Sequence, residues 1–244
     1  MLHIVEGLER LMRIVVTLPT YNEAENIQPL VEELLALGDE FEVLVIDDDS
    51  PDRTWDIVMR MSKTNPGVHL IRRIGERGRG TAGLVGFRWA RDNGADAVVE
   101  MDADFSHQPR FIPSLLEPIR AGEANIVIGS RLVKGGKEIG RSPIRTLITL
   151  FANAYIRTVL GLRIRDCTSG FRVFDRRALE SLPWEKMRCR GPEIVQEVLH
   201  EARKIGLSMV ERPIVFEERR AGQSTFNVKI MLRSLLYMLR LRFQ

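Results

Sequence analysis

Short apolar runs alternate with helix-like segments along the first half of the chain, and this alternation restricts the possible folds more than any other feature. The runs are short and continuously apolar, as expected for buried strands, and cover residues 13–19, 41–47, 68–72, 97–104 and 125–130. The segments between them have helical character and cover residues 22–37, the stretch from about 54, and residues 78–93 and 109–121. Asn22 is the expected N-cap of the first helix. This order predicts an α/β fold with a mostly parallel, Rossmann-like sheet, flanked by helices and joined by right-handed crossovers.

The pattern changes after Arg131. Residues 132–142 are rich in Gly and Lys, which is typical of a mobile surface loop. Pro143 should begin a helix that reaches Leu160. We expect the rest of the chain to form a polar turn (166–172) leading into a short strand, a helix (192–205), a strand (209–217), a loop (219–224) and a helix from Asn227 to the end.

The composition of the 244 residues suits one sizeable domain, with or without an appendage, because 44% are hydrophobic and 28% charged. A net charge of +3 is mild and gives no reason to expect a nucleic-acid partner. Two cysteines, Cys167 and Cys189, are too few for a disulfide framework, so we expect buried free thiols and a reducing compartment. The first residues lack the pattern of a signal peptide, and no apolar run approaches the about 20 residues that span a bilayer.

Two carboxylates, Asp102 and Asp104, follow the apolar run that begins at Ala97. Strand alternation would point both side chains to the same side, with the small Ala103 between them. Two close carboxylates repel each other unless a cation lies between them, and Mg²⁺ and Mn²⁺ prefer such oxygen ligands. The pattern therefore favours a metal–diphosphate site. A solvated strand end or a helix N-cap is the alternative interpretation.

Polar clusters also end the first two strands, at Pro19 and at Asp47-Asp48-Asp49. In a parallel sheet these ends lie on one edge, where nucleotides bind. The glycine cluster of residues 78–83 follows the third strand and lacks the spacing of a dinucleotide-binding fingerprint. There is no P-loop motif either, so the sequence argues against both of those nucleotide-binding classes.

Seven short motifs occur in a fixed order: Pro19-Thr20-Tyr21-Asn22-Glu23, Asp47-Asp48-x-Ser50-Pro51-Asp52, Gly78-x-Gly80-Thr81-Ala82, Asp102-Ala103-Asp104-x-Ser106-His107, Gly129-Ser130-Arg131, Ser169-Gly170-Phe171-Arg172 and Phe216-x-x-Arg219-x-x-Gly222-x-Ser224. Together they resemble the dolichol-phosphate (polyprenyl-phosphate) mannosyltransferases, which are inverting glycosyltransferases of the GT-A fold. The resemblance covers residues 13–226. Two positions depart from the family pattern: Arg53 replaces a usual Gly, and Thr225 replaces a usual Lys.

The resemblance implies a glycosyltransferase catalytic domain over residues 1–226 and a C-terminal amphipathic helix over residues 227–244. It implies a role for particular residues in donor binding: Pro19, Tyr21, Glu23, Asp48, Asp102, Ala103 and Asp104. Asp102, Asp104 and the weaker candidate Ser106 would hold Mg²⁺ or Mn²⁺. Phosphate ligands would be Arg131, Arg145 and Arg172 toward the acceptor, while Asp102, Asp104, Arg131 and Arg219 would be catalytic. His107 is either a ligand or structural, and Glu197 matches an acidic position of the family.

The activity implied is inverting transfer of mannose from GDP-mannose to a polyprenyl (dolichyl) phosphate. One alternative is transfer of glucose from UDP-glucose, or of another sugar, to the same kind of lipid. Another is a catalytically silent, nucleotide-binding subunit of a membrane complex. The apolar face of the last helix suits a membrane surface or a protein contact. We expect a peripheral protein on the cytoplasmic face of a membrane, with a membrane-anchoring partner subunit left open.

Overall fold

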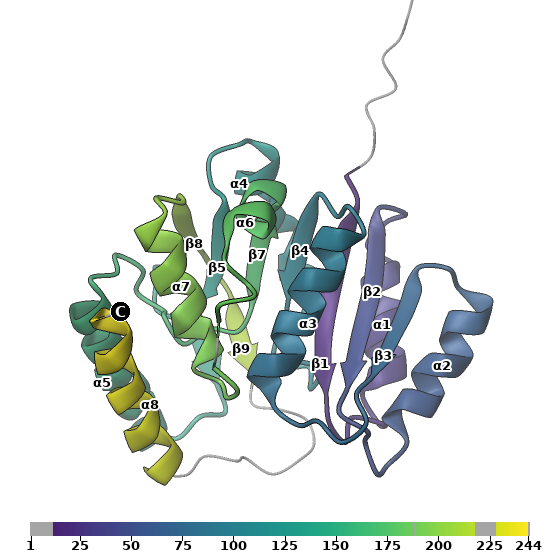
Figure 1. The fold of residues 1–244 in the computed structure, drawn as a ribbon, viewed down its shortest axis with the longest axis horizontal. Coiled ribbons are helices and arrows are strands. Elements are labelled where there is room, and N and C mark those ends of the chain that lie inside the picture. Colours follow the sequence, from purple (N-terminus) through teal and green to yellow (C-terminus); the bar gives the residue numbers. More distant parts are fainter. Residues whose placement is uncertain (1–11, 188, 218–227, 244) are drawn as a thin grey trace, which may run out of the picture.

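A seven-stranded sheet forms the centre of the protein in a computed structural model that describes residues 12–187, 189–217 and 228–243 (Figure 1). The strand order is β3-β2-β1-β4-β7-β5-β8, and only β7 is antiparallel to its neighbours among these paired strands. The mostly parallel sheet expected from the sequence is therefore confirmed. The strands are β1 (Ile14–Thr20), β2 (Phe41–Asp47), β3 (Val68–Arg72), β4 (Ala97–Glu100), β5 (Ile126–Ser130), β7 (Arg172–Asp175) and β8 (Met209–Pro213).

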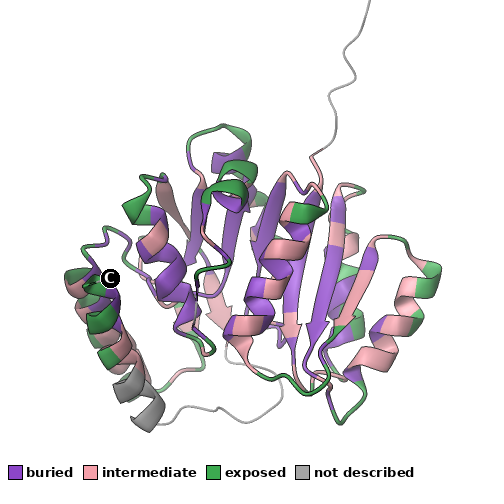
Figure 2. Cartoon of the chain, in the orientation of Figure 1, coloured by how far each residue is buried: buried purple, intermediate pink, exposed green. Residues whose placement is uncertain are grey.

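Helices cover both faces of this sheet, and the strands contribute side chains to a core on each face. Val15 points into one core, whereas Ile14 and Val16 point into the other, as alternation along a strand requires. The five inner strands β1, β2, β4, β5 and β7 are mostly buried, whereas the edge strands β3 and β8 are largely half-buried (Figure 2). One face is covered by α3 (Arg79–Asp92), α6 (Arg176–Ser181) and α7 (Ile194–Lys204), and the other by α1 (Ile27–Leu35), α2 (Thr54–Thr64) and α4 (Ile112–Arg120), the last preceded by the 3₁₀ turn Pro109–Phe111.

Two further helices, α5 (Pro143–Leu160) and α8 (Val228–Arg242), lie side by side at one end of the molecule (Figure 1). The Tyr155 hydroxyl on α5 donates a hydrogen bond of 3.0 Å to the carbonyl of Leu235 on α8. The helices predicted from Pro143 and from about Asn227 are thus both present. No helix within the described ranges is long and apolar enough to cross a membrane.

A second, two-stranded parallel sheet joins β6 (Lys137–Ile139) to β9 (Val215–Glu217). Two sequence predictions are therefore wrong: residues 132–142 contain a strand, and residues 209–217 form two strands. Pro213 is the last residue of the edge strand β8, where its missing N–H removes no bond to β5. The Ile214 N–H donates to the Ser130 carbonyl at 3.0 Å. The next residue, Val215, begins β9 in the small sheet.

Two boundaries near the polar edge of the sheet also differ from prediction. β4 ends at Glu100, opposite the first residue of its antiparallel neighbour, Arg172, so Asp102 and Asp104 lie in the loop that follows. Strand alternation is therefore the wrong reason for their proximity. Asn22 does not cap α1: its φ is +60°, and the helix begins five residues later, at Ile27.

Candidate functional site

A cavity of about 200 Å³ opens at the carboxyl ends of β1, β2 and β4, which are neighbours in the sheet. The chain builds β2 and β3 on one side of β1 and then β4 on the other side, so the strand order changes direction at this point. Such a switch point is the usual place for a ligand in an α/β sheet. All seven residues expected to bind the sugar nucleotide line it, and their binding roles remain predictions. Among the described residues, the lining consists of Pro19, Thr20, Tyr21, Glu23, Asp48, Arg79, Ala82, Asp102, Ala103 and Asp104.

Asp48 ties together three segments on one side of the cavity. One carboxylate oxygen accepts from the Gly78 N–H at 2.8 Å, directly before α3. The other accepts from Nε of Arg73 at 2.7 Å, one residue past β3. Asp48 and Arg73 are both buried, so this ion pair holds the ends of β2 and β3 against the start of α3.

Tyr21 and Glu23 line the same cavity from the turn between β1 and α1. The Arg77 guanidinium lies 3.7 Å from the Tyr21 ring centre, a cation–π contact that links this turn to the loop before α3. The Glu23 N–H donates to the Thr54 hydroxyl at 3.0 Å, and its carboxylate accepts from the Asn26 side chain at 2.8 Å. These bonds fix the turn without any helix cap at Asn22.

The loop after β4 holds the two expected metal ligands through contacts of its own. The Asp102 N–H donates to Nδ1 of His107 at 3.1 Å. Asp104 is 4% exposed, and its Oδ1 accepts from the Ser106 N–H at 3.1 Å and from the Ser106 hydroxyl at 2.5 Å. Ser106 is buried and orients Asp104 here, so its own role as a ligand remains a prediction.

His107 is buried between two aromatic rings, and its ring centre lies 5.1 Å from that of Phe171 and 5.6 Å from that of Phe216. Burial disfavours the charged imidazole and lowers the pKa of His107, although Asp102 opposes the shift. Neutral Nδ1 accepts the Asp102 N–H, which places the ring proton on Nε2. The structure therefore supports the structural interpretation of this histidine.

Arg79 is a cavity residue that the sequence motifs did not identify. Its Nε and Nη2 donate to Oδ1 of Asp102 at 3.0 and 2.7 Å. Burial opposes the guanidinium charge, but Asp102 and Glu100 outweigh it, so the pKa of Arg79 is raised. The only available signal was its place as the variable residue in Gly78-x-Gly80, which does not reveal where the side chain points.

The residues present fit a divalent cation that also binds a diphosphate. Asp102 and Asp104 both line the cavity, and Asp104 is oriented by two donors from Ser106. In the part of the chain that the structure describes, no group of three or more acidic, His or Cys side chains could hold a metal. Two carboxylates are nevertheless a usual protein contribution when phosphate oxygens and water supply the other ligands.

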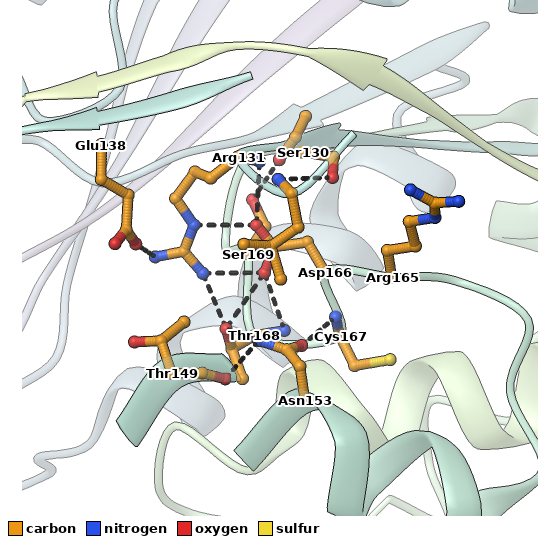
Figure 3. A network of polar contacts seen from close by, with 12 residues as sticks. Ser130, Arg131, Glu138, Thr149, Asn153, Arg165, Asp166, Cys167, Thr168 and Ser169 are labelled. Carbon is orange, nitrogen blue, oxygen red and sulfur yellow. Dashed lines mark hydrogen bonds and ion pairs between the residues drawn. The ribbon is translucent and has the colours of Figure 1, made fainter. Parts of the chain in front are cut away.

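Arg131 lies in a buried network that Figure 3 shows in detail. Nε and Nη2 donate to Asp166 at 2.8 and 2.7 Å, and Nη2 also donates to the Thr168 hydroxyl at 2.7 Å. Nη1 lies 3.1 Å from Glu138. All three guanidinium nitrogens are thus engaged by protein groups in this structure, and the expected phosphate contact remains a prediction.

The structure describes two of the three other arginines that were expected to bind phosphate. Arg172 is 0% exposed, and it pairs with the equally buried Glu100 and donates to the Val195 carbonyl, so it does not reach the cavity surface. Arg145 is partly exposed on the first turn of α5. Arg219 lies outside the described residues.

Glu197 and the two cysteines have packing roles. Glu197 is buried on α7 and accepts from the Cys189 N–H at 3.1 Å. Cys167 and Cys189 are buried free thiols, as expected, and burial raises the pKa of each to about 12. Burial therefore disfavours the reactive thiolate form of both side chains.

A family model described as "Glycosyl transferase family 2" matches residues 15–182 of the chain. The chain belongs to glycosyl transferase family 2. The chain is therefore a glycosyltransferase, which is the enzyme class that the sequence motifs predicted.

Curated relatives agree with this membership. The chain is 38% identical over 213 residues to the undecaprenyl-phosphate mannosyltransferase of Micrococcus luteus, covering 87% of each protein. It is 37% identical to the polyprenol monophosphomannose synthase of Mycolicibacterium smegmatis, over 87% of this chain and 80% of that protein. Identity to the dolichol-phosphate mannosyltransferase of Pyrococcus furiosus is also 37%, over 94% of this chain and 64% of that protein.

Solved structures confirm the GT-A-type fold. Glucosyl-3-phosphoglycerate synthase from Mycobacterium tuberculosis, in complex with Mn²⁺, UDP-glucose and phosphoglyceric acid, has a TM-score of 0.67 at 22% identity, covering 95% of this chain and 79% of that one. A mannosyltransferase from Pyrobaculum calidifontis, in complex with GDP-mannose and Mn²⁺, has a TM-score of 0.54 at 17% identity, covering 95% and 73%. Fold neighbours of this chain thus bind sugar nucleotides together with Mn²⁺.

Proposed function

We propose that this glycosyltransferase moves mannose from GDP-mannose to a polyprenyl phosphate, with inversion at the sugar. One observation carries the proposal: the seven residues expected to bind a sugar nucleotide converge on one cavity at the carboxyl ends of β1, β2 and β4. Relatives at 37–38% identity are named as mannosyltransferases or mannose synthases of polyprenyl-type phosphates, which supports the same donor sugar and acceptor class.

Stabilising negative charge is the main chemical demand of this reaction, because the nucleoside diphosphate leaves the sugar as an anion. Mg²⁺ or Mn²⁺ held by Asp102 and Asp104 would supply positive charge to the departing diphosphate. Asp48, Tyr21 and Glu23 would bind and orient the nucleoside on the other wall of the cavity. The acceptor is a phosphate monoester, which is already largely ionised at neutral pH, so the site needs little general-base assistance.

The lipid acceptor requires access from a membrane surface, and we propose that α5 and α8 provide it. Large apolar side chains on both helices, and one directly after α8, are exposed to solvent: Ile144, Leu147, Leu150, Phe151, Leu236, Leu239 and Phe243. A bilayer surface would cover such a face, and Arg240 and Arg242 in the last turn of α8 suit anionic headgroups. The enzyme would then act peripherally on the cytoplasmic face of a membrane, where an anchoring subunit could bind beside the same helices.

A donor panel tests the proposal. Purified protein is incubated with polyprenyl phosphate, Mn²⁺ and GDP-mannose, UDP-glucose or other sugar nucleotides, and radiolabelled lipid product is extracted. We expect transfer with GDP-mannose, none in EDTA, and none with a free polyprenol as acceptor. Transfer only from UDP-glucose would replace the donor, and no transfer from any donor would favour a silent subunit.

Asp104→Asn supplies the site-specific arm of this test, with Asp92→Asn as a matched control at the exposed end of α3. We expect Asp104→Asn to lower the transfer rate by about 100-fold or more, because the diphosphate loses an essential source of charge compensation. Asp92→Asn should retain the full rate. Equal rates for the two variants would contradict the metal–diphosphate role.

A further inference from the structure

The donor cavity contains a positive charge that belongs to the chain itself. Arg79 makes two hydrogen bonds to a single oxygen, Oδ1 of Asp102, which is one of the two carboxylates expected to bind the metal. The guanidinium and the metal would therefore share one carboxylate. Arg79 comes from the first turn of α3, so this contact joins α3 to the loop after β4 within the cavity.

The protein makes specific room for this guanidinium. A Cβ atom at Gly170 would lie 2.4 Å from Nη2 of Arg79, so no larger residue fits there while Arg79 keeps its position. Nη1 of Arg79 lies 3.6 Å from Oε1 of Glu100, and both atoms are buried without a hydrogen-bond partner among the described residues. An arginine serving only as a structural tie would normally have such a donor satisfied.

The charges around Asp102 determine how strongly a metal ion can bind there. Three carboxylates, Glu100, Asp102 and Asp104, meet two guanidinium groups, Arg79 and Arg172. Among the described residues, removing Arg79 therefore makes this group more negative by one charge. A bare divalent cation approaching Asp102 is repelled by Arg79 and competes with it for the same carboxylate.

We propose that Arg79 is a resident counter-cation of the donor site: it holds Asp102 before the donor arrives and weakens the binding of bare metal. When metal and sugar nucleotide enter together, Arg79 leaves Asp102 and pairs with the diphosphate. Guanidinium groups bind phosphate oxygens well, so the diphosphate compensates Arg79 for the contact that it gives up. The metal and the nucleotide consequently bind cooperatively. This inference rests on the proposed function only in taking the cavity to be the donor site.

Mn²⁺ binding tests the proposal without any sugar transfer. Free Mn²⁺ is followed by electron paramagnetic resonance as the ion is titrated into the protein, alone and with guanosine diphosphate. The proteins are wild type, Arg79→Leu, Arg79→Gln and the control Arg91→Leu, which removes the same charge from a similarly half-buried position near the other end of the same helix. We expect about tenfold tighter Mn²⁺ binding without nucleotide in both Arg79 variants, and less than about a twofold change in the control.

The titrations with guanosine diphosphate measure how strongly the nucleotide tightens Mn²⁺ binding in each protein. Guanosine diphosphate should tighten Mn²⁺ binding strongly in wild type and in Arg91→Leu, and clearly less in the Arg79 variants, because these have lost the diphosphate contact. Equal Mn²⁺ affinities for the Arg79 variants and Arg91→Leu would overturn the proposal. That result would leave mannose transfer untouched, so the two proposals fail separately.

Gly170→Ala gives an independent arm that keeps the charge of Arg79. The added Cβ displaces the end of the flexible Arg79 side chain and leaves Asp102 unpaired with it. Mn²⁺ binding without nucleotide should therefore tighten here as well. Tightening in the Arg79 variants alone would overturn the claim that the contact with Asp102 is the cause. Thermal melts establish folding of each variant, and Arg79→Gln with Gly170→Ala decide the question if Arg79→Leu does not fold.

Discussion

Arg172 and Glu100 face each other across β7 and β4, and neither side chain has exposed surface. Two charges that are removed from water lose hydration, and only their attraction and further hydrogen bonds offset that loss. Burial accordingly lowers the pKa of Arg172, although Glu100 acts against the shift. The pair fixes β7 between β4 and β5, so this arginine has a structural task.

Removal of one partner should therefore be costly. Arg172→Met leaves Glu100 as a buried, poorly compensated carboxylate and should lower the free energy of unfolding by about 3–5 kcal/mol. Adding Glu100→Gln should recover part of this loss. Urea denaturation of the three proteins gives the measurement. Unchanged stability in Arg172→Met, with weaker binding of the lipid phosphate, would instead favour the phosphate role that the sequence implied.

Residue placement could be predicted where topology alone determines it. Pro19 lies at the end of β1, and Asp48 and Asp104 follow β2 and β4, which are neighbours of β1 in any sheet of this order, so their meeting at one edge was predictable. The positions of Arg79 and Arg172 depend on side-chain direction and on the register between β4 and β7. Neither property is encoded in a local pattern of residues.

The start of α3 approaches the segment before α7 closely. A Cβ atom at Gly80 would lie 2.5 Å from the Gly191 carbonyl and 2.7 Å from the Cys189 carbonyl. Both contacts are with backbone, which cannot swing aside as a side chain can. The position of α3, and with it that of Arg79, thus depends on the absence of a side chain here.

Gly80→Ala should consequently destabilise the protein by about 1–3 kcal/mol, because the helix must shift to accommodate one carbon atom. Gly83→Ala, one turn further along α3, is the control, since its Cβ would meet only Oε1 of Glu100 at 3.4 Å. Alanine is the better helix former, so the control should be neutral or stabilising. Thermal unfolding compares the two, and equal melting temperatures would contradict the close-packing argument.

The exposed face of α5 gives a second prediction at the scale of an element. Leu147→Asp should reduce binding to anionic lipid vesicles, because a charge replaces an apolar contact with the bilayer. Ile74→Asp is a matched control: Ile74 is 73% exposed and Leu147 68%, but Ile74 lies beyond β3, away from α5 and α8. Vesicle flotation measures the bound fraction. Equal losses in the two variants would show that α5 is not the membrane contact.

Elements were predictable where the chain carries start and stop signals. Ser142 caps α5 by accepting from Arg145, Pro143 begins it, and Gly161 ends it at a φ of +64°, so the predicted bounds of this helix were correct. The strand β6 has only three residues, two of them exposed, and its partner β9 lies 76 or more residues away in sequence. Such a strand exists because of tertiary pairing and leaves no periodic pattern.

At the scale of the whole molecule, two buried histidines connect folding to pH. Burial lowers the pKa of both His107 and His200, whereas an unfolded histidine titrates near ~6.5. Below that value the unfolded chain binds more protons than the folded protein, so stability is lost as pH falls.

Unfolding free energies measured between pH 7.5 and 5.5 should show this loss, at up to about 1.4 kcal/mol per pH unit for each histidine. His200→Gln removes one of the two groups and should make the dependence clearly shallower. This range lies above the usual titration of exposed carboxylates, which keeps their contribution small. A pH dependence that is identical in His200→Gln would contradict the assignment for His200.

The antiparallel strand β7 has an evolutionary consequence. Because β5 and β7 are adjacent, with Ile128 opposite Arg172, residues 131–171 leave the sheet and return to it at nearly the same place. That excursion carries β6 and α5, and its tertiary partners β9 and α8 come from the end of the chain. Recombination could therefore exchange these two segments together between relatives without altering any pairing among β1, β2, β3 and β4. Relatives could in this way come to use different acceptors while they keep the same cavity at the carboxyl ends of β1, β2 and β4.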